Sequence, residues 1–186
     1  MSFFYTRTAI FLHWLVALGL VGTFAMGFYM HDMPLSPSKL QLYSWHKWAG
    51  VTLFFVILVR LGWRVAHTPP PLPEMMSAPM RFAAHAAHCV MYALMVAIPL
   101  TGWLMSSAQG FQVVWFGVAP LPDLLPKDAG LAELLKSVHM VLNYTLLALV
   151  VTHIGAALKH HYIDKDGVLA SMLPMRAKRA PSRVSA

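Results

Sequence analysis

The sequence predicts an all-α integral membrane protein: a bundle of four transmembrane helices in a single domain over residues 1–186. The chain is 58% hydrophobic and only 11% charged, whereas soluble domains carry roughly 25% charged residues. Its apolar residues fall into four runs, each long enough to cross a bilayer as a helix, which takes about 20 residues. The polar segments between these runs are too short to form a separate soluble domain.

The first helix is expected over about 9–30, with His13 one turn from its start. Gly19, Thr23 and Gly27 form a stripe of small residues at i, i+4 spacing. Such a stripe allows close approach by another helix or by a flat ligand, and the spacing alone does not choose between the two.

The second helix is expected over about 42–65, after a short polar connection. His46 lies near its start and Arg60 near its end, 14 positions apart and so on similar faces. Arg60 either extends to the membrane interface, as basic residues at helix ends do, or meets a buried anionic partner.

The third helix is expected over about 80–105, with His85 and His88 near its start and Pro99 near its end. A proline there is acceptable if neighbouring groups satisfy the carbonyl that it frees. The connection that follows is rich in proline, glycine and aromatic residues, and we expect it at the membrane surface, which aromatic residues prefer.

The fourth helix, expected over about 134–160, carries His139 and His153. Their separation of 14 residues is four turns less roughly 40°, so both imidazoles project from nearly the same face, ~21 Å apart along the axis. Ionisable residues inside a membrane are costly and usually face the protein interior. Two of them on one face predict two sites, one near each membrane boundary. His160 follows one heptad later, at the rim.

Basic residues set the expected topology. One side of the membrane receives Arg7, Arg60, Arg64, Arg81, Lys159, Lys165, Arg176, Lys178, Arg179 and Arg183, and the other receives Lys39, Lys47, Lys127 and Lys136. This bias predicts that both termini are cytoplasmic. The net charge of +7 is therefore read as topology and contact with anionic lipid, not as nucleic-acid binding. The single cysteine, Cys89, excludes an intrachain disulfide and a CxxCH site for covalent haem.

Depth then pairs the histidines. With this topology His13 and His153 lie near the cytoplasmic side, and His46 and His139 near the outer side. Each pair is suited to bind one haem iron from opposite faces, which leaves no open coordination position and favours outer-sphere electron transfer.

Three alternative roles for the histidines stay open. They are interhelical hydrogen bonding, a proton or metal carrier, and a zinc site, although zinc needs about four ligands at one point. For His85 and His88 four roles stay open: replacing one cytoplasmic ligand, lining a proton path, contacting propionates, or, for one of them, packing alone.

Four segments carry a resemblance to a known family: FLHWLVALGL, SWHKWAG, PLTGW and VVTHIGAALKHHYIDKD. They are similar to bacterial cytochrome b561 over essentially the whole chain. The resemblance implies a multi-pass protein of the bacterial inner membrane with four helices and two non-covalent haem b groups. The positions that match the family's haem ligands are His13, His46, His139 and His153, the same set that depth pairing gives.

Within that family, the length and the lack of an appended domain resemble members that oxidise superoxide and reduce ubiquinone. The implied activity is a superoxide:ubiquinone oxidoreductase, with superoxide arriving from the periplasm. Lys47 and Lys136, close to the outer histidines in sequence, are expected at the superoxide entrance, unless they are ordinary interfacial lysines. His160 with Arg60 or Arg81 is expected to bind the quinone or the propionates.

The alternative function is a haem b membrane anchor subunit that relays electrons between a dehydrogenase or hydrogenase and the quinone pool. Such a subunit needs a docking surface, for which the short loops offer little. The sequence identifies no protein partner; membrane lipid, ubiquinone and superoxide are the expected partners.

Overall fold

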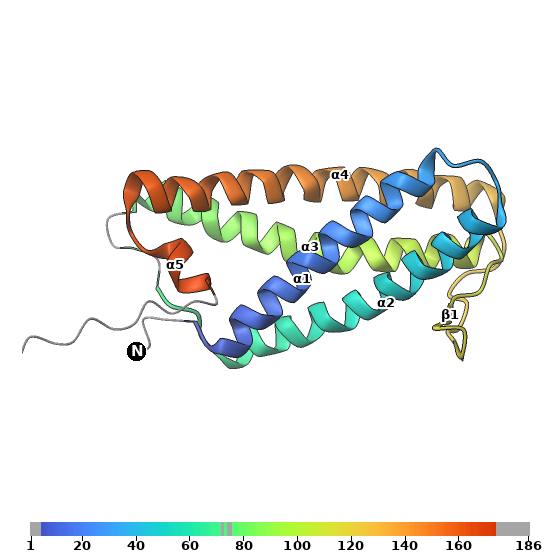
Figure 1. The fold of residues 1–186 in the computed structure, drawn as a ribbon, viewed down its shortest axis with the longest axis horizontal. Helices are drawn as coiled ribbons and strands as arrows, with labels where there is room; N and C mark the ends of the chain where they lie inside the picture. The colour runs from blue at the N-terminus through green and yellow to red at the C-terminus, as the bar shows by residue number, and fades with distance from the viewer. Residues whose placement is uncertain (1–4, 72, 74–75, 174–186) are drawn as a thin grey trace, which may run out of the picture.

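Four long helices run along a common axis in the computed structural model, which describes residues 5–71, 73 and 76–173 (Figure 1). They are α1 (Arg7–His31), α2 (Pro37–Ala66), α3 (Ala78–Ala108) and α4 (Ala129–Lys159). Each is long and apolar enough to cross a membrane. The predicted all-α architecture with four membrane-spanning helices is therefore confirmed. The basic tail residues used for the topology argument, beyond residue 173, lie outside the described residues.

Capping residues place two helix starts earlier than the apolar runs predicted. The hydroxyl of Ser36 accepts from the backbone N–H of Lys39, and Pro37 occupies the first turn of α2. At α4, the carboxylate of Asp128 accepts from the backbone N–H of Leu131 at 2.9 Å. Both first turns come before the long hydrophobic segment that was used to find the helix, so hydropathy alone placed their starts about five residues late.

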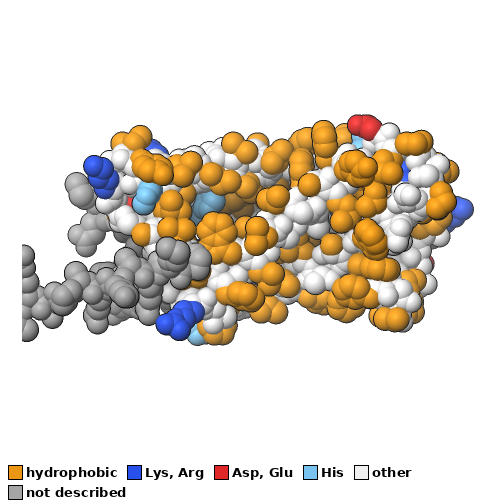
Figure 2. Space-filling view, viewed as in Figure 1, with side chains coloured by type: hydrophobic (Ala, Val, Ile, Leu, Met, Phe, Trp, Pro, Cys, Tyr) orange, Lys and Arg blue, Asp and Glu red, His pale blue; other side chains and the backbone are white. Residues whose placement is uncertain are grey.

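The bundle consists of two closely packed helix pairs, α1 with α2 and α3 with α4. At mid-height the pairs meet in one buried apolar cluster to which all four helices contribute: Val16, Leu53, Ile57, Met91, Leu94, Met95, Ile98 and Leu146. The outer surface is also apolar, and the Lys and Arg side chains in view lie at the two ends (Figure 2). An apolar belt between charged ends is what a lipid bilayer requires.

One end of the bundle, called the terminal end here, holds the start of α1 and the last turns of α4 (Figure 1). There α4 continues as a π-helical turn, His160–Asp164, and the chain reverses through Lys165 and Gly167, both with positive φ. The short helix α5 (Val168–Met172) follows. Its last carbonyl, on Met172, accepts from the indole of Trp14 at 2.8 Å, so α5 is held against α1.

The opposite end, called the hairpin end, carries a feature that the sequence did not predict. The connection between α3 and α4 contains a two-stranded hairpin, β1 (Val114–Trp115) with β2 (Ala119–Pro120). Two indoles attach it to α2: Trp48 donates to the Val114 carbonyl at 2.6 Å, and Trp115 donates to the Thr52 hydroxyl at 3.2 Å. The predicted surface connection is thus an ordered cap on this end of the bundle.

Candidate functional site

Four of the ten histidines form two pairs across the bundle. At the terminal end, the rings of His13 on α1 and His153 on α4 have their centroids 6.4 Å apart. At the hairpin end, the rings of His46 on α2 and His139 on α4 are 6.5 Å apart. All four side chains are partly buried within the membrane-spanning helices. The structure thus brings together the same partners that depth pairing predicted.

The separation within each pair fits two imidazoles on opposite sides of one metal ion. A metal–imidazole bond of ~2.0 Å on each side places the two ring centroids about 6 Å apart. No hydrogen bond joins the rings of either pair in the described part of the chain. Each pair also bridges the α1–α2 half and the α3–α4 half of the bundle. Both pairs therefore fit a haem iron with two axial histidines.

The PLTGW segment of α3 and Ile98, directly before it, orient the ring of His139. Nδ1 of His139 donates to the Ile98 carbonyl at 3.0 Å and contacts the Thr101 hydroxyl at 3.1 Å. A carbonyl only accepts, so the proton is on Nδ1 and Nε2 keeps a free lone pair. Gly102 makes room for the ring, because a Cβ at that position would lie 3.2 Å from Cε1 of His139. The backbone and a glycine, which sequence reasoning passed over, thus orient this ligand candidate.

His46 is accommodated by the small-residue stripe of α1. A Cβ on Gly27 would lie 3.4 Å from Cε1 of His46, while Gly19 packs against Leu53. The stripe therefore serves the packing of α1 on α2 and the approach of His46 together. Nδ1 of His46 is buried and has no hydrogen-bond partner among the described residues.

His13 is held differently, since a guanidinium nitrogen of Arg60 donates to its Nδ1 at 2.9 Å. Arginine has no acceptor, so Nδ1 must accept in this contact. A neutral imidazole that binds a metal through Nε2 carries its proton on Nδ1, where it faces the same guanidinium. The two arrangements exclude each other, and we expect Arg60 to leave Nδ1 when His13 binds a metal.

A third histidine accompanies the terminal pair. The ring of His88 on α3 lies 5.3 Å from that of His153, and its Nδ1 donates to the Ala84 carbonyl at 2.7 Å. This centroid distance is shorter than in either pair. Of the two histidines left open on α3, His88 therefore borders the site, whereas His85 is exposed.

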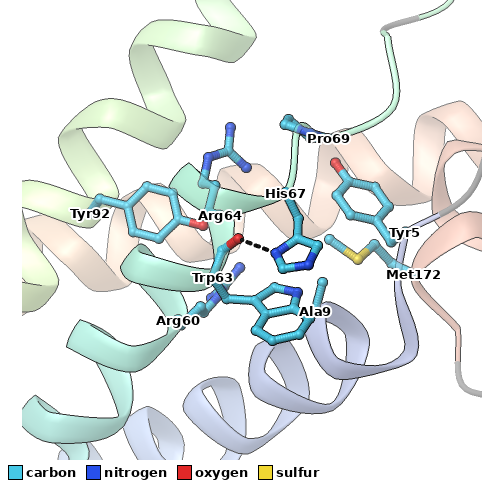
Figure 3. A pocket seen from close by; sticks show the side chains of 9 residues that line it. All are labelled: Tyr5, Ala9, Arg60, Trp63, Arg64, His67, Pro69, Tyr92 and Met172. Atoms are coloured by element: carbon cyan, nitrogen blue, oxygen red, sulfur yellow. Dashed lines mark hydrogen bonds between the residues drawn. The ribbon is translucent and has the colours of Figure 1, made fainter. Parts of the chain in front are cut away.

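Beside Arg60 the structure forms a pocket with about 350 Å³ of space, part of which is open to solvent (Figure 3). Its walls come from the segment before α1, the end of α2, the middle of α3 and Met172 of α5. The polar and aromatic residues that line it are Tyr5, Arg60, Trp63, Arg64, His67 and Tyr92. Sequence reasoning predicted only Arg60. The i, i+4 spacing of Arg60 with Arg64, and of His88 with Tyr92, was the available signal.

The pocket is both aromatic and cationic. The indole of Trp63 stacks on the ring of His67, with centroids 3.9 Å apart and an angle of 9°. The guanidiniums of Arg60 and Arg64 lie 5.3 and 5.4 Å from the ring of Tyr92. Burial raises the pKa of the Tyr5 phenol above its usual 10.0, partly opposed by the charge of Arg64, so the phenol stays protonated and able to donate.

His160 and Arg81, which the sequence also placed near the quinone or the propionates, lie outside this pocket. Nδ1 of His160 contacts carboxylate oxygens of Asp166 and Asp164, at 2.5 and 3.2 Å. Lys159 forms an ion pair with Asp164. Arg81 is exposed in the first turn of α3. Neither His160 nor Arg81 lines the pocket that contains Arg60.

The two lysines expected at the superoxide entrance both lie toward the hairpin end but differ in surroundings. Lys47 follows His46 directly, is half-buried, and places its ammonium 5.9 Å from the ring of Phe111. Lys136 is exposed and pairs with Glu133 at 3.3 Å. Only Lys47 is thus close to the histidine pair and without an ion-pair partner in the described part of the chain.

Comparison with known proteins places these features in a family. The profile of the family "Prokaryotic cytochrome b561" matches residues 5–175. Cytochrome b561 homolog 2 of Escherichia coli is 37% identical over 87% of this chain and 86% of its own length. Cytochrome b561 homolog 1 of the same organism is 28% identical over 92% of this chain and 98% of its own. The probable superoxide oxidase CybB of Yersinia pestis is 27% identical over 92% and 97%.

The matched region contains both histidine pairs, the pocket and all four membrane-spanning helices. The resemblance noted in the sequence is thereby confirmed. The chain belongs to the prokaryotic cytochrome b561 family, multi-pass membrane proteins that transfer electrons by means of haem b.

Proposed function

We propose that this protein is a di-haem superoxide:ubiquinone oxidoreductase of the bacterial inner membrane, with both termini in the cytoplasm. The observation that carries the proposal is the two histidine pairs, one toward each end of the bundle, each at the spacing of axial ligands. His13 with His153 and His46 with His139 would hold the two groups. When bound, haem b supplies a one-electron carrier near each side of the membrane.

Two electrons pass through the protein in each turnover. At the hairpin end, two superoxide anions each lose one electron and leave as O₂. At the terminal end, one ubiquinone gains two electrons and two protons and leaves as ubiquinol. If each histidine pair held one haem, neither iron would keep a free coordination position, and superoxide would give up its electron without binding the metal.

Residues near the hairpin end support the first half of the proposed reaction, the oxidation of superoxide. Superoxide is a small anion, and a cation beside the donor site raises its local concentration. Lys47 is the better placed of the two lysines, since Glu133 already neutralises Lys136. The similarity to a probable superoxide oxidase supports the same substrate.

The test uses the purified haem-loaded protein in nanodiscs with a water-soluble ubiquinone. Superoxide generated enzymatically should reduce the haem bands, and ubiquinol should form with two superoxide consumed per quinol. Added superoxide dismutase should abolish both signals. Haem bands that stay oxidised under a superoxide flux, yet respond to chemical reductants, would exclude superoxide as the donor and favour the membrane-anchor alternative.

A further inference from the structure

We propose that the ubiquinone headgroup binds in the terminal-end pocket between Tyr5, Trp63, Arg64 and Tyr92, with Arg64 and Tyr5 donating hydrogen bonds to its oxygens. This placement rests on the proposed function, and it differs from the position near His160 that the sequence suggested. Three features of the pocket carry it: its charge, its flat walls and its connection to His13.

The charge of the pocket calls for an electron-rich ligand. Two guanidiniums face it, and neither makes an ion pair in the described part of the chain. The two described carboxylates at this end, Asp164 and Asp166, already contact Lys159 and His160. Uncompensated guanidiniums in a partly buried site stabilise negative charge in a ligand. A quinone acquires such charge on its oxygens when it is reduced.

The walls select a flat ring over a compact anion such as phosphate. The rings of Trp63 and His67 are stacked and nearly parallel, and the ring of Tyr92 lies against both guanidiniums (Figure 3). Aromatic surfaces bind planar rings by offset stacking. The pocket is partly open to solvent, so a headgroup can reach these walls from outside.

The pocket is also connected to the terminal-end histidine pair, His13 and His153. Arg60 lines it and reaches Nδ1 of His13 at 2.9 Å. If Arg60 leaves His13 when iron binds, its guanidinium becomes available to the pocket. The neutral phenol of Tyr5 supplies a second kind of donor. The quinone would take two electrons from the site at His13 and two protons from water at the pocket mouth, and leave as quinol.

The experiment follows the chemically reduced, haem-loaded protein as it is reoxidised by ubiquinone-1 in a stopped-flow instrument, so superoxide plays no part. Arg64→Gln should keep both haems and raise the ubiquinone-1 concentration for half-maximal rate by roughly tenfold or more, the effect of losing a charged hydrogen bond. Tyr5→Phe, which removes one oxygen, should raise it ~2–10-fold. Arg7→Gln removes an exposed cation at the same end and should have no effect.

A second readout is covalent labelling. An azido-ubiquinone irradiated with the wild-type protein should label the peptide that contains Trp63 and His67, and Arg64→Gln should reduce that labelling. Unchanged kinetics and labelling in both pocket variants would overturn the placement, as would a large effect confined to His160→Ala. Loss of a haem in Arg64→Gln would assign the guanidinium to the haem carboxylates instead. If ubiquinone-1 fails to reoxidise even the wild-type protein, the quinone half of the proposed function falls, and the placement falls with it.

Discussion

At the scale of single residues, hydrogen bonds distinguish histidines that are ready to bind a metal from one that is not. Nδ1 of His139 and of His88 each donates to a backbone carbonyl, which leaves Nε2 free. In His13 the guanidinium of Arg60 reverses this pattern. The sequence shows all three as histidines near helix ends, and only the structure separates their chemistry.

The histidine pairs predict which haem each substitution removes. If each pair shares one iron, as we propose, His46→Ala and His139→Ala should each lose the haem at the hairpin end and keep the other. His13→Ala and His153→Ala should do the reverse. Pyridine haemochrome assays on the four folded variants give the number of haems, and redox titration shows which one remains. Loss of a haem in His88→Ala with both haems kept in His13→Ala would mean that His88 is the partner of His153.

A glycine gives a sharper test of the hairpin-end site. Gly102→Ala would place a methyl group 3.2 Å from Cε1 of His139, closer than carbon atoms normally pack. We expect weaker haem binding at the hairpin end and unchanged haem binding at the terminal end. Haem content and the rate of haem loss to apomyoglobin measure both. Gly62→Ala is the matched control, because a Cβ there meets nothing within 4 Å. Equal haem retention in the two variants would show that the close approach at Gly102 is unimportant.

At the scale of elements, the sequence predicted what periodicity and hydropathy encode. The four helices and the common face of His139 and His153 follow directly from helical geometry. The pocket could not be predicted in the same way. Tyr5, Trp63, Tyr92 and Met172 come from four separate segments, and Met172 reaches the others because α5 folds back against Trp14. The hairpin was missed because strands of two residues carry no periodic signal.

Indole hydrogen bonds hold the hairpin to α2, and we predict that removing one of them loosens it. Trp48→Phe keeps the aromatic ring but removes the donor to the Val114 carbonyl, so that contact should be lost at a cost of about 1 kcal/mol. Hydrogen exchange should show faster exchange over residues 113–121, and the thermal midpoint should fall slightly. Trp45→Phe, on an exposed indole of the same helix, serves as control. Unchanged exchange in both variants would mean that the cap does not depend on this bond.

At the scale of the whole molecule, charge is distributed unevenly between the two ends. The hairpin end has four lysines, Lys39, Lys47, Lys127 and Lys136, and four acids, Asp32, Asp123, Asp128 and Glu133. The terminal end is more basic, with Arg7, Arg60, Arg64, Arg81, Lys159 and Lys165 against Asp164 and Asp166 among the described residues. No net positive field therefore draws an anion to the hairpin end, and any steering there must be local.

Local steering predicts that the two lysines near the hairpin-end histidines contribute unequally. Lys47→Glu reverses a charge that lies next to His46 and has no ion-pair partner among the described residues, so it should slow reduction of the haem by superoxide several-fold. Lys136→Glu changes a charge that Glu133 already neutralises and should have a smaller effect. Pulse radiolysis, which delivers a known dose of superoxide, measures both rates at several salt concentrations. Because attraction at short range is only partly screened, the wild-type rate should fall modestly with salt. Equal effects of the two substitutions, or a steep salt dependence in the wild-type protein, would mean that a field from the whole hairpin end guides the anion instead.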